Sequence, residues 1–227
     1  MPAAYINVEQ VRGYEFESTV FEYNENAVSL YALGVGAARD PLDESDLRFV
    51  YELHLDGMLV LPTMAVIFPF AANNTIFNMP GLQFHPMLLH GEQYLEIKRP
   101  LTTHARLTNR AHVSNVYDKG SGVLILIDAH SFDEAGNEGA FNQASIFIRG
   151  LGGFGCERRP SSNANVSPER PPDAIHEEKT RPDQALLYRL SGDPNPCTST
   201  LAWRHKVALQ VRSCMVWRHS ASVGALF

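Results

Sequence analysis

The fold is decided by residues 105–149, which read ARLTNRAHVSNVYDKGSGVLILIDAHSFDEAGNEGAFNQASIFIR. Apolar and polar side chains alternate along much of this stretch, which is typical of strands with one buried face. The pattern predicts strands at 105–117, 122–132 and 140–149, separated by turns at 118–120 and 133–138 that contain Asp and Gly. The continuous apolar run at 123–127 predicts that the second of these strands is central in its sheet.

The chain before this stretch predicts one more strand and one helix. The strand is expected at 92–98 and the helix at 24–33, with Asn24 as its cap. Ala27, Leu30 and Tyr31 share one face of that helix, and the glycines at 34 and 36 are expected to end it.

A second buried apolar segment is expected at 58–72, and its prolines leave its type open. A helix followed by an antiparallel meander predicts an α+β fold in which a sheet wraps around a long helix. The hot-dog fold is the natural candidate.

Composition excludes several classes of function. The chain has 227 residues, 44% of them hydrophobic, with a net charge of −6 and no block of Lys or Arg, which argues against a nucleic-acid partner. Residues 1–10 lack a cationic and apolar leader, so no secretory signal is expected. The apolar segment 58–72 is too short to span a bilayer. Three cysteines without CxxC spacing favour a reducing, intracellular compartment.

Glycine and proline mark a boundary after the predicted sheet. We expect a first lobe at 1–155, a linker at 156–180 and the start of a second lobe at 181–196. A faint repeat supports this division, because LYALGVG at 30–36 can be aligned with LYRLSGD at 187–193. The offset is 188 minus 31, or 157 residues. In this alignment the acidic Asp193 lies opposite Gly36, so the first lobe has no acidic side chain at this position.

The strongest chemical signal is YRLSGDPNP at 188–196. A helix ends at Gly192 and is followed by Asp193 and Asn195, each next to a proline. Such a turn can simply stop a helix. The stretch nevertheless closely resembles the signature of the enoyl-CoA hydratase 2 family, shared with MaoC-like dehydratases, in which Gly-Asp-x-Asn-Pro precedes an aliphatic residue and His. Further stretches resemble the family in the same order, at 31–36, 89–96, 118–123, 152–155 and 170–174.

The resemblance implies a double hot-dog enzyme that hydrates trans-2-enoyl-CoA to (3R)-3-hydroxyacyl-CoA in peroxisomal β-oxidation. It implies neither a metal nor a cofactor, since coenzyme A belongs to the substrate. In the family, Asp and His hold one water, one of them acts as base, and backbone N–H groups stabilise the thioester enolate. Carried over, Asp193 is the acid/base and Asn195 the orienting amide. Thr198 occupies the position of the family His, and a hydroxyl does not exchange protons near neutral pH as imidazole does.

For the first lobe, the resemblance implies that it is non-catalytic and holds the acyl chain and coenzyme A. His90 and Gly91 correspond to ligand contacts, and Lys119 corresponds to a basic residue near the polar groups of coenzyme A. Without the resemblance, these residues are a loop histidine and a solvated turn lysine. The other histidines considered show no metal-ligand spacing, namely His54, His85, His104, His112 and His130.

The composition changes abruptly after Pro196, and both tryptophans of the chain lie beyond it. One set of codons that encodes residues 197–217 also reads, shifted by one base, Leu-His-Ile-Asp-Pro and later Pro-Ile-Leu-His-Gly-Leu. The family has Leu-His-x-Asp-Pro and Pro-Ile-Leu-His-Gly-Leu at these places. We therefore hypothesise a lost base near the Pro196 codon, which makes 197–227 an out-of-frame tail with few contacts to the first lobe.

Three functions remain open at this point. The chain is a truncated hydratase 2, an acyl-CoA-binding lobe without turnover, or a remnant that pairs with an intact subunit. Thr198 in place of the family histidine and the missing second lobe favour the second or third. A peroxisomal location follows from the resemblance alone, because the C-terminal Ala-Leu-Phe is no peroxisomal address. A homodimer is compatible with the sequence.

Overall fold

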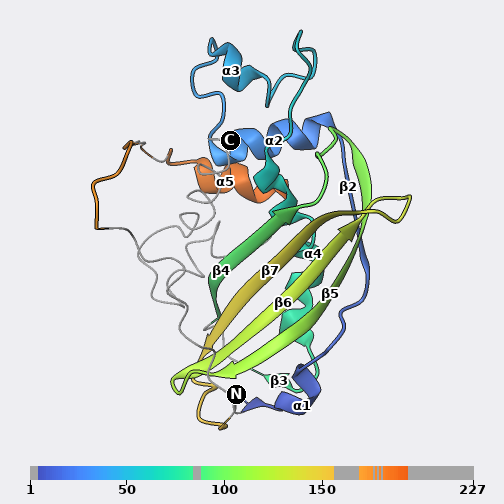
Figure 1. Ribbon diagram of the computed structural model, residues 1–227, viewed down its shortest axis with the longest axis vertical. Coiled ribbons are helices and arrows are strands. Elements are labelled where there is room, and N and C mark those ends of the chain that lie inside the picture. The colour runs from blue at the N-terminus through green and yellow to red at the C-terminus, as the bar shows by residue number, and fades with distance from the viewer. Residues whose placement is uncertain are drawn as a thin grey trace.

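The structure is a computed structural model that describes residues 5–83, 88–155, 169–175, 177, 179 and 181–193. An antiparallel sheet forms its body, and two helices, α2 (Glu25–Val35) and α5 (Gln184–Tyr188), lie together across one end (Figure 1). No helix in the described ranges is both long and apolar enough to cross a membrane.

The main sheet has five strands in the order β2-β5-β6-β7-β4, and every neighbouring pair is antiparallel. The strands are β2 (Thr19–Tyr23), β4 (Leu88–Ile97), β5 (Ala105–Asp118), β6 (Gly122–Phe132) and β7 (Glu138–Arg149). The strand that contains the apolar run is β6. It lies in the middle of the sheet, and Val123, Ile125 and Ile127 are buried there, as predicted.

Two strand boundaries differ from prediction. β4 begins at Leu88 rather than at residue 92, because a β-bulge at the intervening glycine interrupts the alternation on which the prediction depends. The edge strand β2 was missed, since it has only five residues. Its register with β5 runs from Thr19 opposite Asn109 to Tyr23 opposite Ala105.

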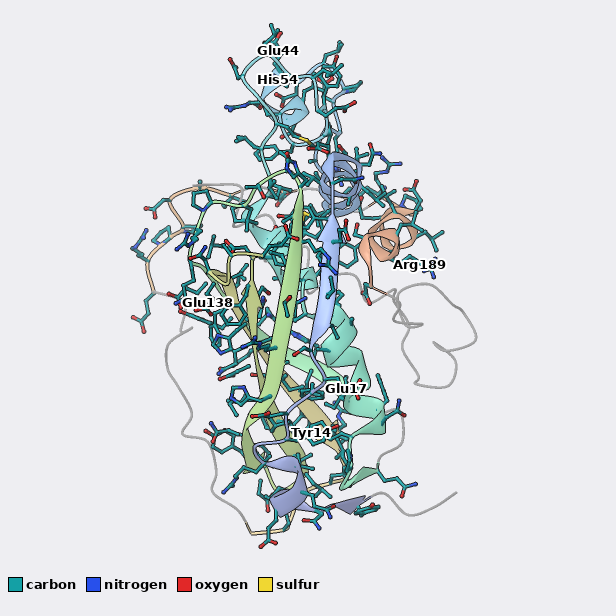
Figure 2. The ribbon with its side chains drawn as sticks, turned by 90° about the vertical axis from the view of Figure 1, so that its right-hand side faces the viewer. Tyr14, Glu17, Glu44, His54, Glu138 and Arg189 are labelled. Atoms are coloured by element: carbon teal, nitrogen blue, oxygen red, sulfur yellow. The ribbon has the colours of Figure 1, made fainter. Side chains whose placement is uncertain are left out.

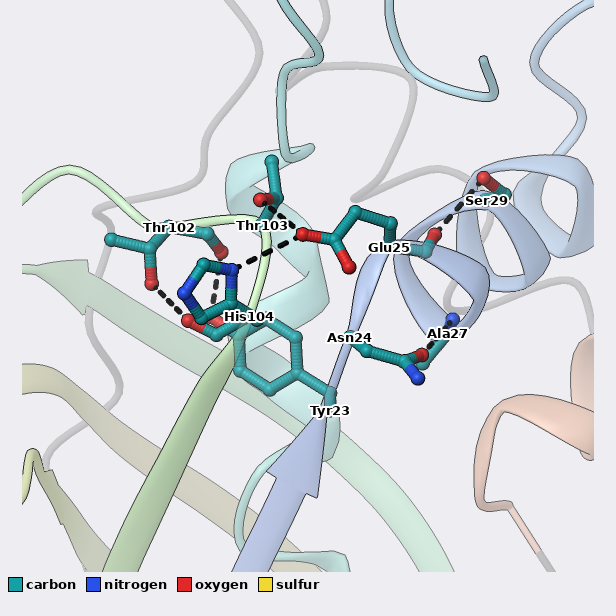
Figure 3. Close-up of polar contacts among 8 residues, drawn as sticks. All are labelled: Tyr23, Asn24, Glu25, Ala27, Ser29, Thr102, Thr103 and His104. Atoms are coloured by element: carbon teal, nitrogen blue, oxygen red, sulfur yellow. Dashed lines mark hydrogen bonds and ion pairs between the residues drawn. The ribbon is translucent and has the colours of Figure 1, made fainter. Parts of the chain in front are cut away.

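Helix α2 begins as the sequence predicts. The Oδ1 atom of Asn24 accepts the N–H of Ala27 at 3.2 Å and so satisfies one of the free donors of the first turn. The carboxylate of Glu25 accepts hydrogen bonds from the hydroxyl of Thr103 at 2.9 Å and from Nδ1 of His104 at 3.1 Å (Figure 3). These contacts tie the start of α2 to the loop that leads into β5.

The end of α2 corrects the prediction. The helix continues through Gly34 and ends at Gly36, which adopts the left-handed conformation with φ 106°. A Cβ atom on Gly34 would lie 3.1 Å from the Cα of Tyr188, so this glycine permits close packing of α5 and does not end the helix. Tyr31 is buried as expected, but the buried face is completed by Val28 and Ala32, while Leu30 stays half-buried.

The element that covers the inner face of the sheet is not α2 but the broken segment 62–78. It consists of η1 (Pro62–Ile67), α4 (Phe70–Asn73) and η2 (Asn74–Asn78), and α4 lies against the sheet in Figure 1. Met64, Ile67 and Phe68 are buried in one apolar core, and Ile76 belongs to a second core nearer the β5–β6 turn. The expectation that residues 24–33 form the helix packed on the sheet is therefore wrong, although the α+β class is right.

Two buried asparagines of the sheet hold this broken segment. Nδ2 of Asn109 in β5 donates to the carbonyl of Phe68 at 2.9 Å, and Nδ2 of Asn142 in β7 donates to the carbonyl of Ala65 at 3.0 Å. The carbonyl of Ala65 also accepts the N–H of Phe68 at 3.4 Å, and because Pro69 has no N–H, the side chain of Asn142 supplies its second donor. The broken segment is thus fixed to the sheet by polar contacts as well as by apolar packing.

The remaining elements are short: α1 (Val8–Val11), α3 (Glu44–Leu47), η3 (Arg189–Ser191), and the two-stranded sheet of β1 (Tyr5–Ile6) and β3 (Leu82–Gln83). Most of the predicted linker, and the whole tail at 197–227, lie outside the described residues. The lobe boundaries and the expected scarcity of tail contacts therefore stay predictions.

Candidate functional site

The predicted acid/base, Asp193, comes just after α5 and η3, which both pack on α2. Asp193 is only 8% exposed, and Gly192 immediately before it takes the left-handed conformation with φ 111°. The rings of Tyr31 and Tyr188 lie 6.2 Å apart between centroids. Nε2 of Gln184 donates to the carbonyls of Leu33 and Gly34, which lie in the last turn of α2. Figure 2 shows Arg189 of η3 at this end and Tyr14 toward the other.

His90 and Gly91 lie on the edge strand β4, near its start. The bulge between His90 and Glu92 leaves Gly91 outside the regular ladder with β7, and a Cβ there would lie 3.4 Å from the carbonyl of Ser145. His90 stands opposite Ile146, and its Nε2 atom lies 3.2 Å from Oε1 of Gln93. Burial lowers the pKa of His90, and the hydrogen bond with Gln93 opposes that shift in part. The ring is therefore neutral near pH 7.

Lys119 lies half-buried in the turn between β5 and β6, and its N–H donates to the carbonyl of Gly122 at 2.9 Å. The neighbouring Asp118 carboxylate accepts N–H groups from Gly120, Gly153 and Gly155 at 2.7 to 2.9 Å. These bonds hold the pKa of Asp118 below its usual range. They also fasten the glycine-rich loop after β7 to the turn that carries the lysine.

The structure brings one group of predicted residues to the same end of the sheet. Leu88, at the start of β4, pairs with Ile148, which in turn pairs with Val123 just after the turn that contains Lys119. His90 and Gly91 are therefore at the end of the sheet where Lys119 lies.

Asp193 is at the other end. α2 follows Tyr23, which pairs with Ala105 at the start of β5, whereas Lys119 follows the end of that strand. A strand of 14 residues rising about 3.3 Å each separates its ends by roughly 40 Å. Within the described residues, Asp193 is thus not brought to His90 or Lys119. Asn195 and Thr198 lie outside them.

Sequence reasoning missed three residues of this region: Asp118, Gln93 and Asn142. Asp118 had a local signal, because an Asp before Lys-Gly and a later Gly-Gly-Phe-Gly run can be joined by carboxylate-to-backbone bonds. Gln93 and Asn142 hydrogen-bond at 2.9 Å across two strands, and no short-range pattern announces such a pair. No group of His, Cys, Asp and Glu suited to a metal ion occurs in the part of the chain that the structure describes.

Comparison with known proteins decides the family. The family model of the MFE-2 hydratase 2 N-terminal domain matches residues 21–150, more than half of the chain. The chain belongs to this hydratase 2 family. A relative named enoyl-CoA hydratase 2, peroxisomal, from Arabidopsis thaliana is 37% identical over 206 residues, which cover 85% of this chain and 67% of the relative.

Longer relatives contain the same region. The peroxisomal multifunctional enzyme type 2 of Mus musculus is 42% identical over 202 residues, which cover 86% of this chain and 27% of that protein. The chain therefore spans about a quarter of this relative's length. Among solved structures, a MaoC-like dehydratase from Phytophthora capsici superposes with a TM-score of 0.75 at 31% identity, covering 91% of this chain and 72% of that one.

These findings confirm the resemblance and the hot-dog fold of the hydratase 2 chain. Its relatives carry the names of enoyl-CoA hydratases, which are lyases, and several are named peroxisomal. The individual roles given to His90, Gly91, Lys119 and Asp193 stay predictions.

Proposed function

We propose that this chain carries the acyl-CoA-holding lobe of a (3R)-3-hydroxyacyl-CoA dehydratase, or trans-2-enoyl-CoA hydratase 2, of fatty acid β-oxidation. The observation that carries the proposal is that the His90–Gly91 bulge and the Lys119 turn lie toward the same end of the sheet, within the region that matches the family. The relatives' names support the reaction class.

In this proposal, each of these residues does one thing for the thioester. Gly91, without a side chain in a bulge, lets the arm of coenzyme A approach the backbone closely. Lys119 offers an ammonium group to a phosphate. Its backbone is held by the turn, and the Asp118 contacts keep that turn in place.

The hydration itself needs a water oxygen to bond the β-carbon and a proton to reach the α-carbon. We assign the acid/base role to Asp193 and the orienting role to Asn195, with no metal and no cofactor apart from the coenzyme A of the substrate. Thr198 stands where the family has its histidine. The chain as written is therefore proposed to bind the substrate class but to turn it over poorly.

A second candidate is acyl-CoA binding without turnover, or pairing with an intact subunit. The position of Asp193 favours it, because Asp193 follows helices that pack on α2, at the end of the sheet opposite to the Lys119 turn. A homodimer is one assembly in which such a lobe could work, and we propose a peroxisomal location on the strength of the relatives' names.

We further propose that residues 197–227 are translated out of frame, on the strength of the two family motifs that the shifted reading contains. Sequencing the transcript across the Pro196 codon tests this directly. A base count that keeps the printed frame through residue 198, in several independent transcripts, would exclude it.

The main experiment measures two quantities on the full chain. Hydration of trans-2-decenoyl-CoA is followed by the loss of enoyl-thioester absorbance, and binding of decanoyl-CoA by titration calorimetry. Turnover supports the first candidate, and binding without turnover supports acyl-CoA binding as the second. A chain that does not bind decanoyl-CoA would contradict both.

Lys119→Ala is expected to weaken decanoyl-CoA binding by up to about fivefold and to reduce its salt dependence, the range for an exposed charge pair. The matched control is Lys98→Ala, at the far end of β4, where the ammonium pairs with Glu96. If both variants lost the same affinity for decanoyl-CoA, Lys119 would not be a ligand-binding residue.

A further inference from the structure

A chain of hydrogen bonds leads from the broken segment to His90, and its direction is fixed at one end. The carbonyl of Ala65 can only accept hydrogen bonds: it accepts the N–H of Phe68 at 3.4 Å, and Pro69, which would serve it in an α-helix, has no N–H. Asn142, only 2% exposed, supplies a second donor from Nδ2 at 3.0 Å. The amide of Asn142 must therefore turn its Oδ1 atom the other way.

The next link is equally constrained. Oδ1 of Asn142 accepts from Nε2 of Gln93 at 2.9 Å, and the same Nε2 donates to the carbonyl of Tyr94 at 3.3 Å. Both partners of this nitrogen are acceptors, so the orientation of the Gln93 amide is set from two sides. Its Oε1 atom consequently faces Nε2 of His90 at 3.2 Å.

Only a protonated Nε2 can make that last bond, because Oε1 of Gln93 has no hydrogen. We propose that Gln93 and Asn142 are positioning residues that hold His90 in its Nε2–H tautomer. Nδ1, which is buried in this structure, is then the only acceptor of the ring.

The neutral state of the ring belongs to the same argument. A doubly protonated ring would donate from both nitrogens, and burial of His90 disfavours that form near neutral pH by lowering its pKa. The first lobe therefore cannot offer His90 as a general acid from Nε2, whose proton is already held by Gln93.

The tautomer can be read without any ligand. Two-bond proton–nitrogen correlation spectra of the ¹⁵N-labelled full chain at pH 7.5, with the ring assigned through His90→Gln, should show Nε2 protonated and Nδ1 unprotonated. Gln93→Ala should move the ring toward the other tautomer. Gln93→Glu keeps an acceptor at this place and should retain Nε2–H.

Gln143→Ala is the matched control. It removes the same side chain from β7, one residue beyond Asn142, where the amide instead donates to Asp128 at 2.8 Å. Its His90 signals should match the unmodified chain. The relay is overturned if the unmodified ring is protonated at Nδ1, or if Gln93→Ala, with its backbone amide spectrum preserved, leaves the tautomer unchanged.

Discussion

Asn109→Ala tests how the broken segment 62–78 is held to the sheet. Asn109 is fully buried and makes hydrogen bonds with two other buried residues, Phe68 and Ser131. Its Nδ2 donates to the carbonyl of Phe68 at 2.9 Å, and its Oδ1 accepts the hydroxyl of Ser131 at 2.6 Å. Truncation to alanine removes both bonds at once and gives water no path to either group.

The expected loss follows from these two groups. A buried polar group that loses its partner costs about 1–3 kcal/mol, so Asn109→Ala should lower the free energy of unfolding by about 2–6 kcal/mol. Native domains are stable by only about 5–15 kcal/mol. The midpoint of thermal unfolding should fall by roughly 4 °C or more for a chain of this size.

The assay is equilibrium unfolding in urea at low temperature, for a set of four proteins that form a double-mutant cycle. Ser131→Ala alone should destabilise by about 1 kcal/mol. In the Asn109→Ala background the same change should stabilise, because it removes a buried hydroxyl that has lost its acceptor. Asn115→Ala, an exposed position on the same strand β5, should stay within about 0.5 kcal/mol of the unmodified chain.

The reversal of sign at Ser131 is the decisive result. Additive losses, or a loss below about 1 kcal/mol for Asn109→Ala alone, would show that the two buried groups find other partners. The segment would then be held by apolar packing and not by the asparagines of the sheet.

Three further outcomes are expected. Because burial lowers the pKa of His90, the unfolded chain protonates first as the pH falls. The midpoint of thermal unfolding should therefore begin to fall as pH drops below about 6.5, and His90→Gln should flatten this slope. Gly34→Leu should destabilise by about 1–3 kcal/mol in urea unfolding, since even a Cβ would lie 3.1 Å from the backbone of Tyr188, whereas Asn26→Leu on the exposed side of α2 should not. Thr198→His should leave decenoyl-CoA hydration below about 1% of that of an intact relative, because acid–base catalysis of ~10²–10⁴-fold needs positioned groups. Restoring the downstream frame should raise this activity. Near-normal turnover from Thr198→His alone would refute the expectation.

The sheet was predictable because its signals are local. The alternation in 105–117 and 140–149 and the glycine turns between them give β5, β6 and β7 to within two residues. For the segment 62–78 only the burial of its apolar part was predictable, because its prolines hide any helical period and its position depends on Asn109 and Asn142, far away along the chain. Helix α2 was found by its cap, yet its place at the end of the sheet depends on a contact between Gly34 and Tyr188 that no local pattern contains.

The same division holds for the candidate site. His90, Gly91 and Lys119 were identified by family motifs, and strand register brings them to one end of the sheet. The residues that hold His90 could not be found in that way, because Gln93 and Asn142 act through hydrogen bonds between strands.

The contact of α2 with α5 and η3 joins the two stretches that the sequence repeat aligns. The stretches aligned by the repeat meet each other: Tyr31 lies against Tyr188, and Gly34 lies close to the side chain of Ser191, its own counterpart at the offset of 157. Contacts between equivalent residues are the mark of two-fold pairing, so the proposed duplication and this packing support each other.

The left-handed glycines refine the alignment. Gly36 ends α2 with φ 106°, and Gly192 ends η3 with φ 111°, so by conformation the two correspond although the sequence offset pairs Gly192 with Val35. Asp193 then stands opposite Ala37 and not opposite Gly36. Under either alignment the first lobe has no side chain that can exchange a proton at this point. In the proposed function, turnover therefore depends on the groups that follow Gly192, and the first lobe contributes by holding the thioester.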